Sequence, residues 1–208
     1  MAKQIEGVYE HILACAKEEF LIKGFKDASL RVIAANANTS TGSIYTRFHD
    51  KQGLFQQIVE PVVQGLMEMY LRIQETFSRM DGKTQVENMG SYTSASMDDM
   101  IDYMYDHFDE FCLLLDASYG TRFQNFMEEM ICIEVEYTYK YMKHIDCQSI
   151  SGGEVTEEFF HIVVTSYFNS VFEVIRHRMS REEAKRYIRL LNKYHMAGCD
   201  TIFYPERY

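Results

Sequence analysis

The chain has 208 residues, 47% of them hydrophobic, which is enough to bury a sizeable core in one large or two small domains. Its formal net charge of −10 argues against a protein that binds nucleic acid over its whole surface. Residues 1–60 carry seven basic and seven acidic side chains, so the excess negative charge lies in residues 61–208, and only the N-terminal part is expected to meet phosphate.

The sequence pattern is helical throughout. Proline occurs only twice and strand-like alternation is scarce, so we expect an all-α protein. The first helix should run from about residue 4 to 23 and end at Gly24. The stretch 28–55 then predicts two short helices joined by a tight turn and followed at once by a third.

Local signals within this stretch define its turns. Ser29 is the expected N-cap of the first short helix, and Ser40 is that of the second. Asn38 suits the left-handed backbone of a sharp helix exit. Ile44 and Phe48 lie one helical turn apart and should face inward. The pattern predicts a helix-turn-helix whose second helix can enter a major groove.

At these residues the chain resembles the DNA-binding domain of the TetR (tetracycline-repressor) family of bacterial transcriptional regulators. The matching positions are Ser29–Leu30, Ile33–Ala34, Ala37, Ser40, Gly42, Ile44–Tyr45, Phe48, Lys51 and Leu54–Phe55. Asn38, Thr39, Arg47 and Gln52 depart from the family pattern, where Gly, Val, an aromatic residue or His, and Glu are usual. These departures bear on the operator sequence rather than on DNA binding.

Candidate DNA contacts follow from this segment and from the resemblance. Tyr45 and Lys51 are the best phosphate contacts, by hydroxyl and ammonium, and the resemblance points the same way. Helix N-termini favour anions, which predicts further phosphate contacts there, and a glycine lets the backbone approach closely. An arginine can read guanine O6 and N7. The phosphate and backbone candidates are Ser29, Thr41, Gly42, Tyr45 and Lys51; the base readers are Ser43, Thr46 and Arg47; Arg31 either contacts phosphate or is solvated.

A long helix is expected from Lys51 towards Arg79, bent or broken at Pro61. It would join a helix-turn-helix DNA-binding domain, residues 1–50, to a helical ligand-binding and dimerisation domain, residues 51–208. Residues 80–96 are the least regular part. Further helices are predicted at 97–117, 121–144, 156–179 and 180–203, with a break at 118–120 and a loop at 149–154, and Thr121 and Ser180 open capping boxes.

The last two predicted helices carry broad apolar stripes. One interpretation is an ordinary core within the chain. The other, supported by the family resemblance, is a two-fold interface in which this helix pair meets its copy as a four-helix bundle. The interface candidates are Phe160, Val164, Tyr167, Val171, Ile175, Tyr187, Leu191, Tyr194 and Gly198.

Methionine and aromatic side chains in the second domain could line a ligand cavity or simply form packed core. The candidates are Met67, Tyr70, Met100, Tyr103, Met104, Phe108, Phe111, Tyr119, Phe123, Phe126, Met127 and Tyr167. The acidic balance of this domain and its aromatic faces favour a cationic lipophile. We therefore expect a small hydrophobic or cationic effector.

Asp102, Asp106 and Glu110 share one helical face, which either binds a divalent cation or is solvated. We favour the solvated face and expect no metal and no cofactor. The chain contains no phosphate-cradling glycine loop, no HExxH and no nucleophile with a credible base, so we expect that it is not an enzyme. Five cysteines without a CxxC pair, and the lack of a signal-peptide pattern or a long apolar run, predict a soluble protein of the reducing cytoplasm.

Together these observations predict a TetR-like homodimer that binds a palindromic operator in double-stranded DNA and is released by its effector. Ligand binding would move the helix over residues 51–79 and change the separation of the two recognition helices. The alternative is a helical protein that binds a small molecule or a partner and whose N-terminal part does not read DNA.

Overall fold

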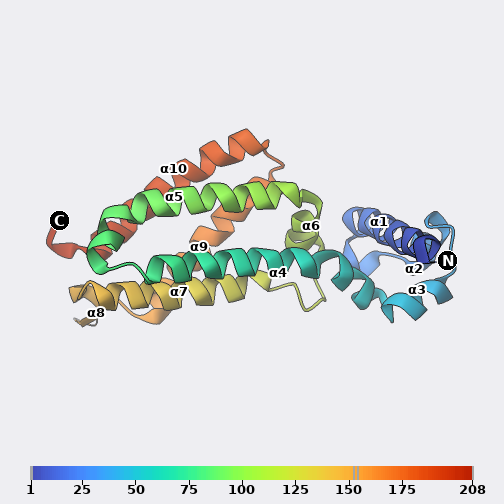
Figure 1. Ribbon diagram of the computed structural model, residues 1–208, viewed down its shortest axis with the longest axis horizontal. Coiled ribbons are helices and arrows are strands. Elements are labelled where there is room, and N and C mark those ends of the chain that lie inside the picture. The colour runs from blue at the N-terminus through green and yellow to red at the C-terminus, as the bar shows by residue number, and fades with distance from the viewer. Residues whose placement is uncertain (1, 152, 154, 208) are drawn as a thin grey trace. The chain divides into compact units, whose positions relative to one another are not determined.

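The computed structural model describes residues 2–151, 153 and 155–207, and every regular element in them is helical, which confirms the all-α class (Figure 1). The elements are α1 (Ala2–Asp27), α2 (Leu30–Asn36), α3 (Thr41–Phe48), α4 (Lys51–Ser78), α5 (Gly82–Asp106), α6 (Phe108–Cys112), a π-helical turn (Leu113–Ala117), α7 (Phe126–His144), α8 (Gln148–Ser151), α9 (Glu157–Arg176), α10 (Arg181–Phe203) and a 3₁₀ turn (Pro205–Arg207).

The chain forms two compact units. The N-terminal unit comprises Met1–Gly65 and His107–Phe126, and the C-terminal unit comprises Leu66–Asp106 and Met127–Tyr208. The sequence placed a boundary at residue 50, whereas the structure divides the chain within α4 and returns a segment from its middle to the N-terminal unit. That segment belongs there because α6 and the π-helical turn pack on α1 with apolar side chains. The functional division at residue 50 stays a prediction.

The core of the N-terminal unit is built from α1 to α4. Phe55 of α4 lies edge-on to Phe20 of α1, with ring centroids 5.1 Å apart, and to Phe25, at 5.4 Å. Gly24 has φ 71°, a left-handed conformation that glycine adopts without strain, and it kinks α1 there. The chain then continues in helical form to Asp27, so the predicted helix end at Gly24 is a kink.

Several predicted helix boundaries are wrong, and local hydrogen bonds account for two of them. Residues 82–96 are helical, not irregular: Asp81 accepts the backbone N–H of Thr84 at 3.1 Å and caps α5. Helix α7 begins at Phe126 rather than Thr121, whose hydroxyl donates to the Ser118 carbonyl at 2.7 Å in a turn. The predicted loop 149–154 includes the end of α8, and residues 152 and 154 lie outside the described residues.

Two other local predictions concern the start of α10 and the proline in α4. Ser180 and Glu183 form the predicted capping box at the start of α10. Pro61 lies inside α4, which runs without interruption from Lys51 to Ser78, so of the two predicted outcomes the break is wrong, and the bend stays a prediction. Among the described residues, no helix combines the length and apolar character needed to cross a bilayer.

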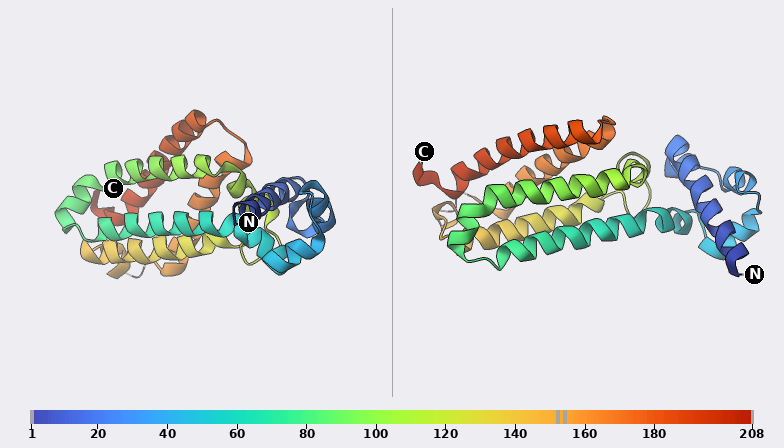
Figure 2. Two further views of the ribbon diagram at one scale, coloured as in Figure 1. Left: turned by 45° about the vertical axis from the view of Figure 1, so that its right-hand side comes forward. Right: turned by 45° about the horizontal axis from the view of Figure 1, so that its top comes forward.

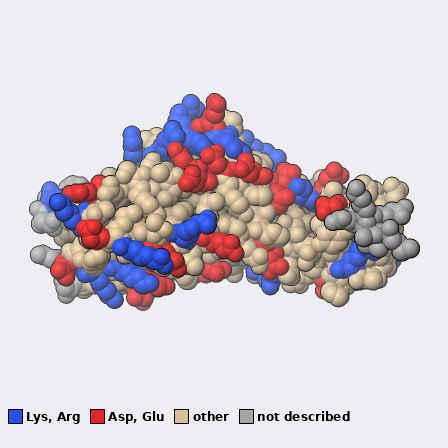
Figure 3. Space-filling model, viewed as in Figure 1, with Lys and Arg blue, Asp and Glu red and all other residues tan. Residues whose placement is uncertain are grey.

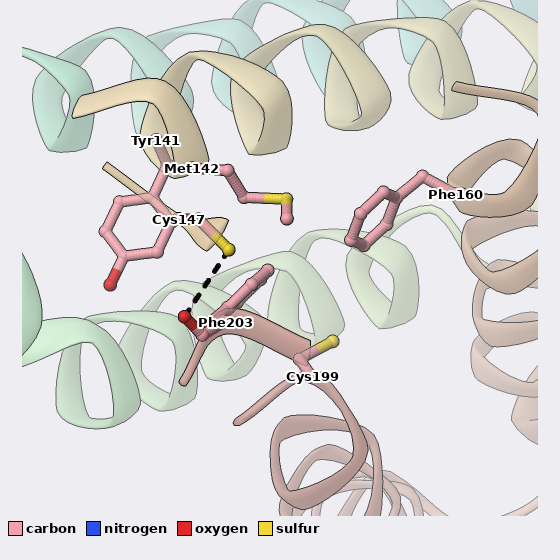
Figure 4. Packing of buried hydrophobic residues seen from close by; sticks show 6 residues of the cluster. All are labelled: Tyr141, Met142, Cys147, Phe160, Cys199 and Phe203. Carbon is pink, nitrogen blue, oxygen red and sulfur yellow. Dashed lines mark hydrogen bonds between the residues drawn. The ribbon is translucent and has the colours of Figure 1, made fainter. Parts of the chain in front are cut away.

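In the C-terminal unit, the second half of α4 and helices α5, α7, α9 and α10 run alongside one another (Figure 2). Helix α9 carries buried residues along much of its length. One cluster joins α7, α9 and α10, where the Cys147 thiol donates to the Phe203 carbonyl at 3.4 Å (Figure 4). The buried members of this cluster are Tyr141, Met142, Cys147, Phe160, Cys199 and Phe203.

Four predicted interface residues of α9 are buried in the core of the C-terminal unit, which corrects the sequence interpretation. Phe160, Val164, Val171 and Ile175 are at most 3% exposed within a single chain, so a second copy cannot reach them. The apolar period of α9 indicated a buried face but not which surface covers it. Of the other candidates, Tyr167 lines an internal cavity, Leu191 is half-buried, and Tyr187, Tyr194 and Gly198 are exposed.

The acidic face of α5 pairs with α10. Lys185 lies 2.6 Å from Asp102, Arg189 lies 2.7 Å from Asp98, and Arg181 contacts both Asp102 and Asp106. Red and blue side chains accordingly interleave on the face formed by these helices (Figure 3). Glu110 lies in the N-terminal unit and pairs with Lys17 at 3.0 Å. The expected solvated face is therefore a set of ion pairs, and the described residues contain no group of three or more side chains suited to a metal ion.

Candidate nucleic-acid interface

The backbone between α2 and α3 adopts the predicted turn. Asn38 has φ 50°, and the Ser40 hydroxyl accepts the N–H of Ser43 at 3.1 Å, which caps α3. Ser29 occupies the predicted N-cap position of α2 in an extended conformation, but its side chain makes no capping hydrogen bond, so that part of the prediction is wrong. Its backbone N–H instead donates to the carboxylate of Glu19 on α1, at 3.0 Å, which ties α2 to α1.

Helix α3 is amphipathic in the predicted sense. Ile44 is fully buried and Phe48 is 2% exposed, and both anchor the helix on the core. The opposite side carries only small, polar or basic side chains. Gly42, Tyr45 and Thr46 are exposed, and Thr41, Ser43 and Arg47 are partly exposed. A short helix held in this way can enter a groove of DNA with its outer side.

An open depression of about 700 Å³ runs between the start of α2, the start of α3 and the start of α4. It brings together five of the nine candidate DNA contacts, namely Ser29, Arg31, Thr41, Tyr45 and Lys51. The other four, Gly42, Ser43, Thr46 and Arg47, lie along α3 itself. Asp50, which was not among the predicted DNA contacts, also lines the depression; its carboxylate accepts the Gly53 N–H at 2.7 Å and so caps α4, the role that its position at the start of that helix predicts.

Lys51 is held in place by the end of α1. Its ammonium donates to the carbonyls of Lys26, at 2.9 Å, and Ala28, at 3.1 Å, and lies 5.0 Å from the centre of the Phe25 ring. An ammonium has three N–H donors, so one remains for a phosphate oxygen. The side chain therefore stabilises the α1–α4 junction as well as supplying positive charge.

Arg47 folds back onto its own helix. Its Nη1 donates to the Ser43 carbonyl at 3.3 Å and also to the Ser43 hydroxyl. The Thr46 hydroxyl donates to the Gly42 carbonyl at 2.8 Å. These are bonds within one helical turn, so both side chains can exchange them for a base edge without disturbing the core.

Gly42 is not required by the fold. A Cβ atom built there would meet only the Ser40 hydroxyl, at 3.6 Å, which is ordinary contact. Gly53 differs sharply, because a Cβ atom there would lie 2.0 Å from the Phe48 carbonyl oxygen. The open space around Gly42 leaves room for the predicted close approach of the DNA backbone.

Tyr45 provides a clean test of phosphate contact. Its side chain is 52% exposed, and its hydroxyl has no hydrogen-bond partner among the described residues. We expect Tyr45→Phe to leave the unfolding free energy unchanged within about 0.5 kcal/mol and to weaken DNA binding by about 1 kcal/mol, roughly fivefold. Fluorescence anisotropy at several salt concentrations checks this, and the slope of affinity against salt should not change because no charge is lost.

The predicted ligand-pocket residues do not form one site. A cavity of about 110 Å³ in the C-terminal unit is lined by three of them, Tyr70, Met100 and Tyr167. Met67, Tyr103, Met104 and Met127 of the same unit do not line it, and Phe108, Phe111, Tyr119, Phe123 and Phe126 lie in the N-terminal unit. The sequence search followed methionine and aromatic stripes, so it missed the polar lining residues Gln74, Glu134, Asn192 and His195.

The geometry of the N-terminal unit defines a helix-turn-helix DNA-binding domain, and the comparisons assign it to a family. Residues 12–58 match the model described as "Bacterial regulatory proteins, tetR family". The comparison with curated proteins finds no match.

Solved structures show the same fold over nearly the whole chain. A TetR-like transcriptional regulator from Rhodococcus sp. RHA1 is 14% identical, with a TM-score of 0.58 and coverage of 92% of this chain and 96% of that one. SmeT of Stenotrophomonas maltophilia, the repressor of a multidrug efflux pump, is 19% identical, with a TM-score of 0.58 and coverage of 91% and 89%. FadR of Bacillus halodurans, a fatty acid degradation regulator, is 11% identical, with a TM-score of 0.57 and coverage of 92% and 95%.

Within this chain, residues 12–58 are thus similar to the DNA-binding segment of the tetR family of bacterial regulatory proteins. Its fold is that of the family's transcriptional regulators. It is a TetR-like DNA-binding transcriptional regulator.

Proposed function

We propose that this regulator is a dimeric repressor that leaves a palindromic operator when a small hydrophobic or cationic effector binds its C-terminal unit. The observation that carries the DNA-binding part is the exposed side of α3 beside a depression lined by Tyr45 and Lys51. The cavity among α4, α5, α7, α9 and α10 supports the effector part. Because the proposed operator is part of chromosomal DNA, we place the protein in the bacterial cytoplasm.

Dimerisation would use the exposed apolar side chains of the last two helices. On α10, Leu190 is 70% exposed and Tyr194 is 80% exposed, and both lie at helical spacing from Tyr187. On α9, Ile162 is 68% exposed. Exposed apolar side chains at this spacing mark an interaction surface. A second copy is the occupant we propose, because two recognition helices about one DNA turn apart read an inverted repeat.

Two helices connect the cavity to the N-terminal unit along the chain, which supports coupling between effector binding and operator binding. Helix α4 begins at Lys51, beside the DNA-binding depression, and carries the cavity residue Tyr70. Helix α5 carries the cavity residue Met100 and leads directly into His107–Phe126, which belongs to the N-terminal unit. A ligand that displaces either helix can therefore bias the position of the DNA-binding residues, as a population shift requires.

Selection of bound sequences from a random DNA pool tests this proposal. We expect enrichment of an inverted repeat with half-site centres about 34–36 Å apart. Gly42→Ala is the matched variant. It should fold with equal or slightly greater stability, since alanine favours a helix, yet enrich the repeat poorly because its methyl group holds the backbone away from the duplex. No enrichment by the wild-type protein would overturn the DNA-reading proposal and favour a small-molecule- or partner-binding protein. That the chain is not an enzyme stays a prediction.

A further inference from the structure

The cavity of the C-terminal unit is small and walled mainly by apolar side chains. Its volume is about 110 Å³, and its apolar lining includes Phe77, Met97, Met100, Phe168 and Met196. For comparison, an engineered apolar cavity of about 150 Å³ in another protein holds a benzene molecule. Methionine side chains can move aside for a guest because they are unbranched and flexible. The cavity is smaller than that one, so a guest of about one ring fits when the methionine side chains move aside.

One side of the cavity carries a carboxyl group without a cationic partner. Glu134 of α7 accepts hydrogen bonds from the Tyr70 hydroxyl and from Nε2 of Gln74, at 2.6 Å. No Lys or Arg lines the cavity, and Glu134 makes no ion pair with any described residue. Burial raises the pKa of Glu134, while these hydrogen bonds act in the opposite direction. A cation placed beside this group would remove the main cost of its ionisation.

Two further polar groups at the cavity lack partners. Asn192 of α10 is 5% exposed. Among the described residues, its Oδ1 accepts no hydrogen bond, and the hydroxyl of Tyr167 on α9 has no hydrogen-bond partner either. Buried polar atoms of this kind are normally satisfied. An amide oxygen can only accept, and a phenol oxygen can accept as well. Together with Glu134, they form a set of acceptors contributed by three helices.

His195, the lining side chain that becomes positively charged on protonation, does not supply the missing positive charge. His195 stacks on Tyr167 with ring centroids 4.1 Å apart, and burial lowers the pKa of His195 to about 4. The imidazole is therefore neutral near pH 7. The lining as a whole offers aromatic faces and oxygen acceptors, and both favour a cation.

We propose that this cavity binds a compact aromatic amine in its protonated form, with the ammonium at Glu134, Asn192 Oδ1 and the Tyr167 hydroxyl, and the ring among the methionine and aromatic walls. This inference rests on the proposed effector function for its biological meaning. Binding itself can be measured without DNA. An organic anion would be repelled by Glu134, and a neutral guest of the same shape would leave that carboxyl group without a counter-charge.

The test uses benzylamine, benzyl alcohol and benzoate, which share a ring and differ in charge, titrated calorimetrically into the full chain at pH 7. We expect benzylamine to bind at least tenfold more tightly than benzyl alcohol, and benzoate not to bind. Glu134→Gln should abolish this preference, whereas Glu129→Gln, which removes the same charge from an exposed site on α7, should keep it. Equal affinity for amine and alcohol, tighter binding of benzoate, or a preference that survives Glu134→Gln overturns the proposal.

A second variant guards against misfolding of the first. Asn192→Leu replaces the unpaired amide by an apolar group of similar size, so we expect the melting temperature to stay equal or rise while amine affinity falls at least fivefold. An unchanged amine affinity in this variant would remove Asn192 from the site and overturn the proposed geometry. The experiments distinguish failure of the amine-binding site from failure of the proposed operator switch. Amine binding without operator release refutes the switch and keeps the site, whereas operator release by another compound without amine binding refutes the site and keeps the switch.

Discussion

Replacing Gly53 by alanine should destabilise the N-terminal unit by about 3 kcal/mol. The added Cβ atom would lie 2.0 Å from the Phe48 carbonyl oxygen and 3.1 Å from the carbonyl carbon. Both neighbours are backbone atoms at the end of α3, so they cannot rotate away as a flexible side chain can. Relief requires a shift of α4 relative to α3, which would also disturb the 2.7 Å hydrogen bond from the Gly53 N–H to Asp50. Urea unfolding followed by circular dichroism measures the loss.

Gly42→Ala is the control within the same unit. Its Cβ atom meets only ordinary contact, and alanine is the better helix former, so we expect no destabilisation and up to about 0.5–1 kcal/mol of added stability. The contrast between the two glycines is the diagnostic result. If both variants had the same unfolding midpoint, the close packing of α4 on the end of α3 would be refuted.

Arg47→Ala should lower affinity for the selected operator by about 1–3 kcal/mol, roughly 5- to 150-fold, and relax the preference at one base position of each half-site. The physical reason is loss of a guanidinium able to bind guanine O6 and N7 together. Stability should change little, because Arg47 is hydrogen-bonded only to Ser43 on its own helix. Binding curves on a set of single-base operator variants measure both effects.

Arg47→Lys separates charge from geometry. Lysine keeps the positive charge but lacks the planar fork of arginine. We expect its non-specific DNA affinity to remain near that of the wild type, while discrimination at the affected base stays low. If Arg47→Ala weakened all operator variants equally, and Arg47→Lys restored them equally, Arg47 would be a phosphate contact rather than a base reader.

The DNA-reading surface could be predicted well because its determinants are local. The Ser40 cap, the left-handed backbone at Asn38 and the inward pair Ile44 and Phe48 each involve residues within a few positions of one another. Their relation is set by helical geometry, which the sequence displays directly. Prediction from local sequence did not find the contact at Ser29, because the group that accepts its backbone N–H is the carboxylate of Glu19, ten residues away.

The cavity could not be predicted in the same way. Tyr70 and Gln74 lie one turn apart on α4, and Asn192 and His195 one turn apart on α10, but no spacing along the chain relates these pairs to each other or to Glu134 on α7. Glu134 looks like one acid among many on α7. Its proposed role in binding a cation follows from two features of the cavity. The lining contains no Lys or Arg among the described residues, and Oδ1 of Asn192 is unpaired; both features depend on how the helices pack.

The sequence by itself determined the helical class, the helix-turn-helix and the side of α3 that faces outward, since these follow from periodicity and capping within single elements. Only the tertiary structure decided which surface covers each apolar face. The α9 stripe with Val164 and Val171 faces the chain's own core, and His107–Phe126 returns to the N-terminal unit. The spacing of apolar residues predicts that a helix face is buried. The hydrophobic effect is non-directional, so this spacing does not predict which surface covers the face.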